Sequence, residues 1–247
     1  MRGNARATLV IFRRELAAYL TSPMGYVVAA ATLLVDGLLF YAEALGPAAG
    51  QRLSADVLSR FFYNTSGLVV IAAVALSIRL IAEERQTRSL TLLRTAPVGD
   101  WHIVLGKFLA AFVFLACITL ASLYMPLLIL VNGKISIGQV AVGYLGLFLI
   151  GAAVLAIGMF ATALTRSYLL AAVVGGALTA AMFLFWPLAR VVEPPLSNVF
   201  SGLALHATHF YGFQVGILHL RDVVYYVALT YFFLLLATTT MEAKRWE

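Results

Sequence analysis

The sequence predicts an all-α integral membrane protein with six transmembrane helices. Its 247 residues are 62% hydrophobic and only 11% charged, and the mean hydropathy is +0.95. Apolar runs long enough to cross about 30 Å of hydrocarbon recur along the chain. Because the connections between these runs are short, we expect residues 1–247 to form a single membrane domain without a soluble domain.

The N-terminal segment, residues 1–22, predicts a helix that lies on the inner membrane surface. Arg6, Arg13, Arg14 and Glu15 interrupt it too often for the apolar region of a cleavable signal. Apolar residues recur instead at helical spacing, with basic side chains at the edge of the stripe. The stripe consists of Leu9, Phe12, Leu16 and Leu20. Pro23 ends this helix, and a simple orientation signal is the other interpretation.

Six apolar segments follow, each bounded by charge, Gly or Pro. They are Met24–Leu45, Phe61–Leu80, Phe108–Val131, Val140–Leu164, Tyr168–Leu188 and Val223–Thr240.

The positions of Lys and Arg predict the orientation, because short cytoplasmic loops carry an excess of these residues. With the N-terminus inside, the inner side carries Arg2, Arg6, Arg13, Arg14, Arg79, Arg85, Arg88, Arg94, Lys107, Arg166, Lys244 and Arg245. The outer side carries Arg52, Arg60, Lys134, Arg190 and Arg221. Both termini are therefore expected on the cytoplasmic side of the membrane. The charge of +6 reflects this asymmetry, and no pattern of a nucleic-acid-binding surface accompanies it.

Asp36 is an acid inside the first apolar segment, where an ionisable group is costly. It lies about 20 Å along this helix, toward the outer half of the bilayer. Glu43 follows seven residues later on the same face. Two interpretations stay open for Asp36: a contact with substrate or a coupled proton, and a structural hydrogen bond.

The outer connection between Glu193 and Arg221 is too apolar for an exposed loop and too interrupted to span the membrane. Pro194 and Pro195 exclude a continuous helix. We expect a re-entrant or interfacial hairpin that lines a pathway or covers helix ends. Its histidines, His206, His209 and His219, have no carboxylate or thiolate at matching spacing, so we expect polar loop residues rather than a metal site. His206 and His209 are candidates for the translocation path.

Catalytic motifs are not found in this sequence. Cys117 is the single cysteine, which excludes a disulfide framework. The pairs Gly106–Lys107 and Gly133–Lys134 lack the first glycine and the Ser or Thr of a P-loop. Neither G-x-S-x-G nor H-E-x-x-H occurs. We therefore expect no enzyme activity, no metal and no cofactor in this chain.

The densest charge in the protein lies in the cytoplasmic loop "EERQTRSLTLLRTAPVGD", residues 83–100. Leu90 and Leu93 are three residues apart, and Pro97 ends the segment. These features favour a short helix along the membrane surface that either docks a cytoplasmic partner or simply borders the membrane.

The stretch "EERQTRSLTLLRTAPV" resembles the signature of ABC type 2 exporter permeases, in which this segment is the coupling helix that contacts the ATPase subunit. "FRRELAAYLTSPMGYVV" resembles the interfacial helix of the same family. "HFYGFQVGILHLRDVVYY" is similar to the segment before the last span in the branch of gliding-motility permeases and of the permease for nitrous-oxide reductase maturation.

This resemblance implies which residues couple transport to the ATPase. They are Glu83, Glu84, Arg85, Leu90, Leu92, Leu93, Thr95 and Pro97. The chain departs from the family pattern at Arg88–Ser89, where relatives have Gly-Thr, and at Val215, where they have Arg before the glycine.

The resemblance also implies a separate P-loop ATPase subunit that binds ATP and Mg²⁺, a second permease copy as a homodimer, and motion of the coupling helix as the driving step. Small residues at which helices approach closely are Gly151, Ala152, Ala156, Gly158, Gly175 and Gly176, either within one chain or between two.

Two other functions stay open. One is a stand-alone secondary transporter or channel that uses Asp36 and a proton gradient, although no clear internal repeat accompanies it. The other is a membrane scaffold that moves nothing. The sequence does not specify the substrate.

Overall fold

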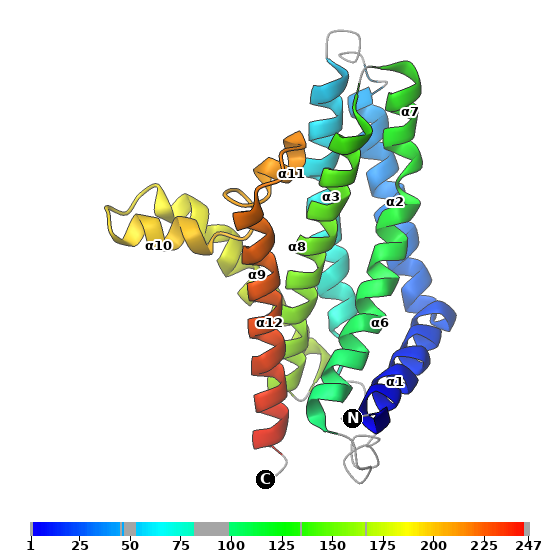
Figure 1. The fold of residues 1–247 in the computed structure, drawn as a ribbon, viewed down its shortest axis with the longest axis vertical. Coiled ribbons are helices and arrows are strands. Elements are labelled where there is room, and N and C mark those ends of the chain that lie inside the picture. The colour runs from blue at the N-terminus through cyan, green and yellow to red at the C-terminus, as the bar shows by residue number, and fades with distance from the viewer. Residues whose placement is uncertain are drawn as a thin grey trace.

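The computed structural model describes residues 2–44, 46, 53–81, 99–133, 135–165 and 167–244. Within these ranges the protein is helical, without strands. The helices are α1 (Arg2–Thr21), α2 (Pro23–Ala44), α3 (Ser54–Ser77), α6 (Asp100–Ala121), α7 (Tyr124–Asn132), α8 (Ile137–Leu164), α9 (Tyr168–Ala189), α10 (Leu196–Leu203), α11 (Tyr211–Val215) and α12 (Leu220–Ala243). Both ends of the chain lie at the same end of the bundle (Figure 1).

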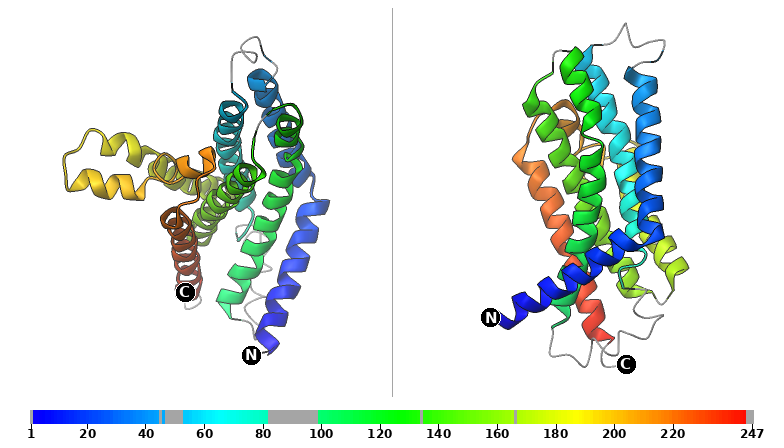
Figure 2. Two further views of the ribbon diagram at one scale, coloured as in Figure 1. Left: turned by 45° about the horizontal axis from the view of Figure 1, so that its top comes forward. Right: turned by 90° about the vertical axis from the view of Figure 1, so that its right-hand side faces the viewer.

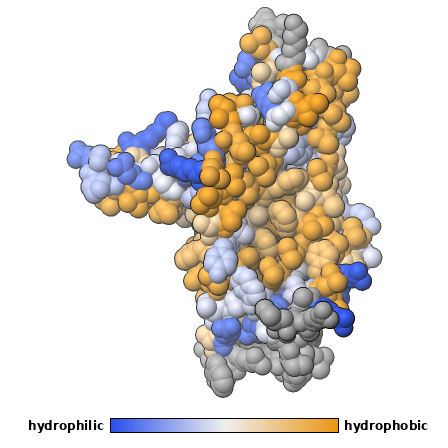
Figure 3. Space-filling model, viewed as in Figure 1, coloured by the Kyte–Doolittle hydropathy of each residue, from blue (hydrophilic) through white to orange (hydrophobic). Residues whose placement is uncertain are grey.

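Six of these segments are long and apolar enough to cross a membrane: α2, α3, α6 with α7, α8, α9 and α12. The prediction of an all-α protein with six spans is therefore confirmed. On the face in Figure 3, hydrophobic residues cover the middle of the bundle and hydrophilic residues gather toward its lower end.

Helix α8 is the centre of the bundle and packs against α3, α6, α9, α11 and α12. Glycines let large neighbours approach its backbone. A Cβ at Gly143 would overlap the ring of Phe62, and a Cβ at Gly146 would lie 2.5 Å from Cβ of Phe213. Ser136 begins α8, since its side chain accepts a hydrogen bond from the Gln139 amide at 3.1 Å.

The third apolar segment begins earlier than Phe108, where the sequence predicted its start. Helix α6 already begins at Asp100 and carries Lys107 into the protein, where only 2% of the residue is exposed. The sequence prediction was wrong here because it treated Lys107 as a charge at the membrane edge. Its Nζ instead lies 3.2 Å from Oε1 of Glu15 on α1.

The apolar face of α1 that contacts the bundle also differs from the predicted stripe. Ile11 and Tyr19 are buried, whereas Leu9 and Leu20 are about half exposed. Ile11 packs against Gly106, where an added Cβ would lie 3.0 Å from its Cγ2. Helix α1 crosses the lower end of the bundle obliquely (Figure 2) and ends at Thr21, and Ser22 separates it from Pro23 at the first position of α2.

Helices α9 and α10 form a lobe that extends sideways from the bundle (Figures 1 and 2). Helix α10 is amphipathic: Leu196, Val199, Phe200 and Leu203 recur at helical spacing, and Phe200 stacks on Phe185 of α9 at 5.6 Å between ring centroids. Helix α10 occupies the first part of the connection for which a re-entrant or interfacial hairpin was predicted. Its position relative to the membrane stays a prediction.

Candidate functional site

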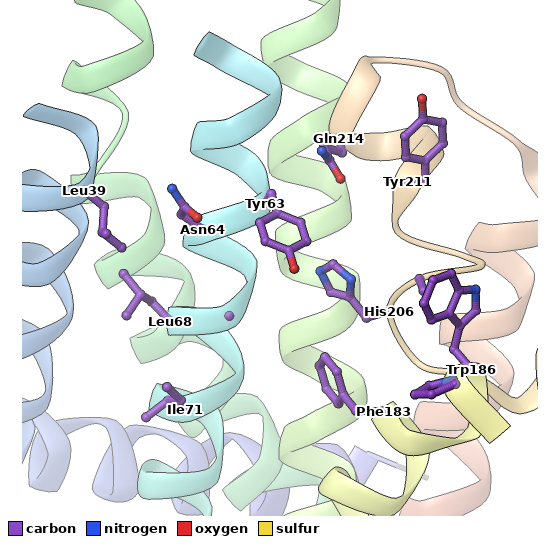
Figure 4. Close-up of a pocket in the computed structure, with 13 residues that line it drawn as sticks. Leu39, Tyr63, Asn64, Leu68, Ile71, Phe183, Trp186, His206, Tyr211 and Gln214 are labelled. Atoms are coloured by element: carbon purple, nitrogen blue, oxygen red, sulfur yellow. The ribbon is translucent and has the colours of Figure 1, made fainter. Parts of the chain in front are cut away.

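A cavity of about 710 Å³ opens between the bundle and the α9–α10 lobe (Figure 4). Its walls come from α2, α3, the end of α9 and the segment that leads into α11. The lining residues are Leu39, Tyr63, Asn64, Gly67, Leu68, Ile71, Phe183, Trp186, Pro187, His206, Ala207, Tyr211 and Gln214. Cavities of this size accommodate small organic ligands.

One helix face supplies the α3 wall. Tyr63, Asn64, Gly67, Leu68 and Ile71 are spaced so that they lie along one side of a helix. None of them is buried, while the opposite face of this part of the helix is buried against α8 and α2. Tyr63 and Asn64 are polar residues in an apolar span, and this is the signal in the sequence that could have indicated a cavity at this face of α3.

The α9 wall comes from the second half of α9, whereas the first half approaches α8 closely at Gly175. A Cβ at Gly175 would lie 3.3 Å from Cβ of Ala161 and 3.6 Å from Cα of Gly158. Beyond this contact α9 diverges from the bundle, and Phe183, Trp186 and Pro187 face the space that results. The guanidinium of Arg190 stacks over the Trp186 ring at 3.6 Å.

The third wall, residues 204–214, is attached to the neighbouring helices by hydrogen bonds. The Leu205 amide donates to the Met182 carbonyl at 3.1 Å, and the hydroxyl of Tyr226 donates to the Leu205 carbonyl at 2.7 Å. The side-chain Nε2 of Gln214 donates to Oγ of Ser59 at 3.0 Å, which joins this segment to α3. Gly216 ends α11 with φ of +83°, a left-handed conformation that favours glycine.

His206, which the sequence analysis named as a candidate for the translocation path, lines the cavity. Its Nε2 lies 2.7 Å from Oγ of Ser66. Its ring stacks on Phe183 at 5.6 Å and on Phe210 at 4.9 Å, and meets the Tyr63 ring edge-on at 5.5 Å. Burial lowers the pKa of His206 to about 4, so the ring is neutral near pH 7.

His209, the second path candidate, is 2% exposed and is not among the residues that line the cavity. Its Nδ1 lies 2.7 Å from Oδ1 of Asp222, and its Nε2 lies 3.2 Å from the Gly202 carbonyl oxygen. The ring also stacks on Tyr225 with centroids 3.8 Å apart. These contacts tie the lobe to the start of α12.

Asp36 is also absent from the cavity lining and is 2% exposed. The hydroxyl of Thr65 donates to its Oδ1 at 2.7 Å. Glu43 lies 3.8 Å from Arg60, so it pairs with α3 through a separate contact. The structural hydrogen bond, one of the two interpretations drawn from the sequence, is therefore present.

The predicted coupling residues lie outside the described part of the chain. These are Glu83, Glu84, Arg85, Leu90, Leu92, Leu93, Thr95 and Pro97.

The helices on both sides of this segment contact α1. The Tyr19 hydroxyl donates to the Leu76 carbonyl at 3.0 Å near the end of α3. A guanidinium nitrogen of Arg79 donates to Oγ of Ser22 at 2.6 Å. On the other side, Lys107 of α6 pairs with Glu15. The end of α3 and the first two turns of α6 are thus joined through one helix.

Within the described residues no three His, Cys, Asp or Glu side chains gather into a metal site. Cys117 is exposed, Gly106 and Lys107 lie within α6, and Gly133 ends α7 with an extended backbone. The polar groups of the cavity are hydroxyl, amide, indole and imidazole groups, which bind ligands by hydrogen bonds.

Fold and cavity together define a multi-pass membrane protein with a binding space on the side of its helical bundle. Residues 9–243 match the family described as ABC-2 family transporter protein, and the chain belongs to this family. It is therefore a membrane permease component of ABC transporters. A comparison with curated proteins found no match.

Proposed function

We propose that this chain is the membrane subunit of an ABC exporter, driven by a separate P-loop ATPase that docks on residues 83–97. The ATPase binds ATP and Mg²⁺, and this chain catalyses no reaction itself. The family match supports the proposal, and so does the outer-loop resemblance to the gliding-motility and nitrous-oxide-reductase-maturation branch. In this proposal the termini and the coupling segment face the cytoplasm across a prokaryotic-type inner membrane.

The observation that carries the proposal is the connection of both neighbours of the coupling segment to α1. Tyr19 and Ser22 contact the end of α3 and the residue Arg79 beyond it, and Glu15 contacts α6. A displacement of the coupling segment would therefore move α3 and α6 together rather than one of them. Because α3 forms a cavity wall, such a movement changes the space in which a substrate is held.

Two copies of this chain would complete the transporter. Helices α2 and α9 have 11% and 22% of their most apolar stretch buried, against 67% for α8. These two helices border the cavity, so a second copy seated there would close it from the lipid and create a shared pathway.

The first test is the co-purification of the tagged protein from gently solubilised membranes, with partners identified by mass spectrometry. We expect a P-loop ATPase to co-purify with the wild type and to be lost from the Glu83→Lys, Glu84→Lys double variant. Glu193→Lys, which adds a positive charge in the outer connection, is the control and should retain the ATPase. An intact wild-type protein without any ATPase would contradict the proposal.

A further inference from the structure

The cavity walls carry no charge. Among the described residues that line the cavity, none is Asp, Glu, Lys or Arg. Arg190 covers the Trp186 ring but is not itself a lining residue. An ionised ligand would lose hydration here without gaining a counter-charge, which is a large cost. The lining therefore favours an uncharged ligand.

His206 offers this ligand one hydrogen-bond acceptor. Oγ of Ser66 lies 2.7 Å from the Tyr63 carbonyl oxygen and 2.7 Å from Nε2 of His206. A hydroxyl has a single proton, and if Ser66 gave it to His206, two oxygens would lie 2.7 Å apart with no hydrogen between them. Ser66 therefore donates to Tyr63 and accepts from Nε2–H of His206.

This arrangement fixes the role of the other ring nitrogen. A neutral imidazole with a proton on Nε2 has an acceptor at Nδ1, and the low pKa of His206 keeps the ring neutral. Within the described part of the chain Nδ1 has no hydrogen-bond partner, and it is not among the buried polar atoms there that lack one. The ring projects toward the cavity in Figure 4.

Aromatic rings make up much of the remaining surface. Tyr63, Phe183, Trp186 and Tyr211 border the cavity from three different elements. Ring faces and edges pack favourably against other rings, beyond the gain from buried area alone. This surface favours a ligand with rings over one with flexible chains only.

We propose that the cavity binds an uncharged molecule with an apolar, ring-bearing body and one hydroxyl or N–H group, which donates a hydrogen bond to Nδ1 of His206. The inference rests on the proposed function, since it names the class of substrate that the permease would carry. The residue that selects this class is His206, and Ser66 is the positioning residue that orients its ring.

Three photoreactive probes with the same benzophenone body test this inference on the purified chain in lipid nanodiscs. 4-(Hydroxymethyl)benzophenone is uncharged and has a donor, 4-(methoxymethyl)benzophenone lacks the donor, and 4-benzoylbenzoate is an anion. After irradiation, mass spectrometry locates the labelled peptides. We expect the alcohol to label the peptides around Tyr63 and Trp186, with half-saturation at about tenfold lower concentration than the methyl ether, as expected for one hydrogen bond.

Two histidine variants separate the hydrogen bond from packing. His206→Phe keeps a ring to stack on Phe210 but removes Nδ1, so the alcohol should lose its advantage while labelling by the ether stays unchanged. His219→Phe is the matched control, because His219 lies in the same connection but outside the cavity lining, and it should behave as the wild type. The comparison of the two neutral probes on the wild type tests the inference even if a variant does not fold.

Competition distinguishes a membrane lipid from a ring-bearing solute. We expect 4-biphenylmethanol to displace the alcohol probe and dioctanoylglycerol, a neutral lipid with a hydroxyl but no ring, to displace it far less. Equal labelling by alcohol and ether, preferential labelling by the anion, labels only outside the cavity, or equal displacement by the lipid would each overturn the inference. Because no ATPase is present, these failures differ from a failed co-purification, which would instead contradict the proposed function.

Discussion

Asp36 of α2 faces α3, where its Oδ1 accepts a hydrogen bond from the hydroxyl of Thr65 with the two oxygens 2.7 Å apart. A buried carboxylate with this partner needs no substrate to explain it, because the hydrogen bond compensates part of the cost of burial. The gradient-driven alternative requires Asp36 to meet a translocated proton or substrate, yet Asp36 is absent from the cavity lining. The residue therefore favours a structural role.

We predict that Thr65→Val lowers the free energy of unfolding by about 1–3 kcal/mol, because it removes the donor and keeps the shape of the side chain. Asp36→Asn should cost less than about 1 kcal/mol, since the amide oxygen still accepts from Thr65. Denaturant unfolding in detergent micelles measures both changes. Thr32→Val is the control, because Thr32 bonds only to the Val28 carbonyl of its own helix at 2.7 Å. Asp36→Asn with normal stability and no transport would support the gradient-driven alternative.

At the scale of elements, α1 is attached to the bundle through a buried ion pair. Glu15 is 16% exposed in its side chain and contacts both Lys107 of α6 and Arg14. Burial alone would raise the pKa of Glu15, but the charge of Lys107 and the hydrogen bonds from Arg14 and Lys107 outweigh it and lower this pKa below its ordinary value of 4.5. The carboxylate is thus more stable in the folded protein than in the unfolded chain.

This shift predicts a loss of stability in acid. A group with a lowered pKa in the folded state contributes stability above its ordinary pKa, and this contribution disappears as the pH falls through the lowered value. We expect the melting temperature of the wild type to fall more than that of Glu15→Gln as the pH drops from about 6 toward 4 and below. Glu193→Gln, at an exposed position, should follow the wild type. Parallel curves for the wild type and Glu15→Gln would show that the pair does not hold α1.

At the scale of the whole molecule, the small residues of the spans divide into two groups. Gly151 packs against Leu115 and Val69, and Gly158 against Ser77, so these glycines serve contacts within one chain. Gly175 packs against Ala161. An added Cβ at Gly176 would meet open space, on a helix that is little buried. If two copies assemble as proposed, Gly176 leaves room on α9 for close approach between them.

We predict that Gly176→Cys in a Cys117→Ala background forms a disulfide-linked dimer in oxidised membranes, seen by electrophoresis without reductant. Leu120→Cys in the same background is the control, because Leu120 is 47% exposed on α6, on the other side of the bundle from α9. It should stay monomeric. Cross-linking through Leu120 but not through Gly176 would place the second copy on the opposite face.

The fold class followed from the sequence alone. A span needs about 20 consecutive apolar residues to cross the hydrocarbon, and it must be helical because the bilayer offers its backbone no hydrogen bonds. Both requirements concern neighbouring residues, so each span can be recognised directly in the sequence. The break at Pro23 and the interruption before the last span are equally local, because proline and glycine restrict or free the backbone at their own position. The predicted coupling residues are local too, and they remain a prediction.

The tertiary structure decided what depends on residues far apart in the sequence. Lys107 belongs inside the protein because Glu15 meets it there, and the sequence alone gave no reason to pair the two. Of the three path candidates, only His206 lines the cavity, since α3, α9 and the segment before α11 converge around it. His209 and Asp36 were equally candidates in the sequence, but in the folded protein their side chains hydrogen-bond to Asp222 and Thr65 outside the cavity lining. The residue types and the apolar spans are local properties that the sequence determines, whereas the access of a side chain to a cavity is a property of packing and follows only from the folded bundle.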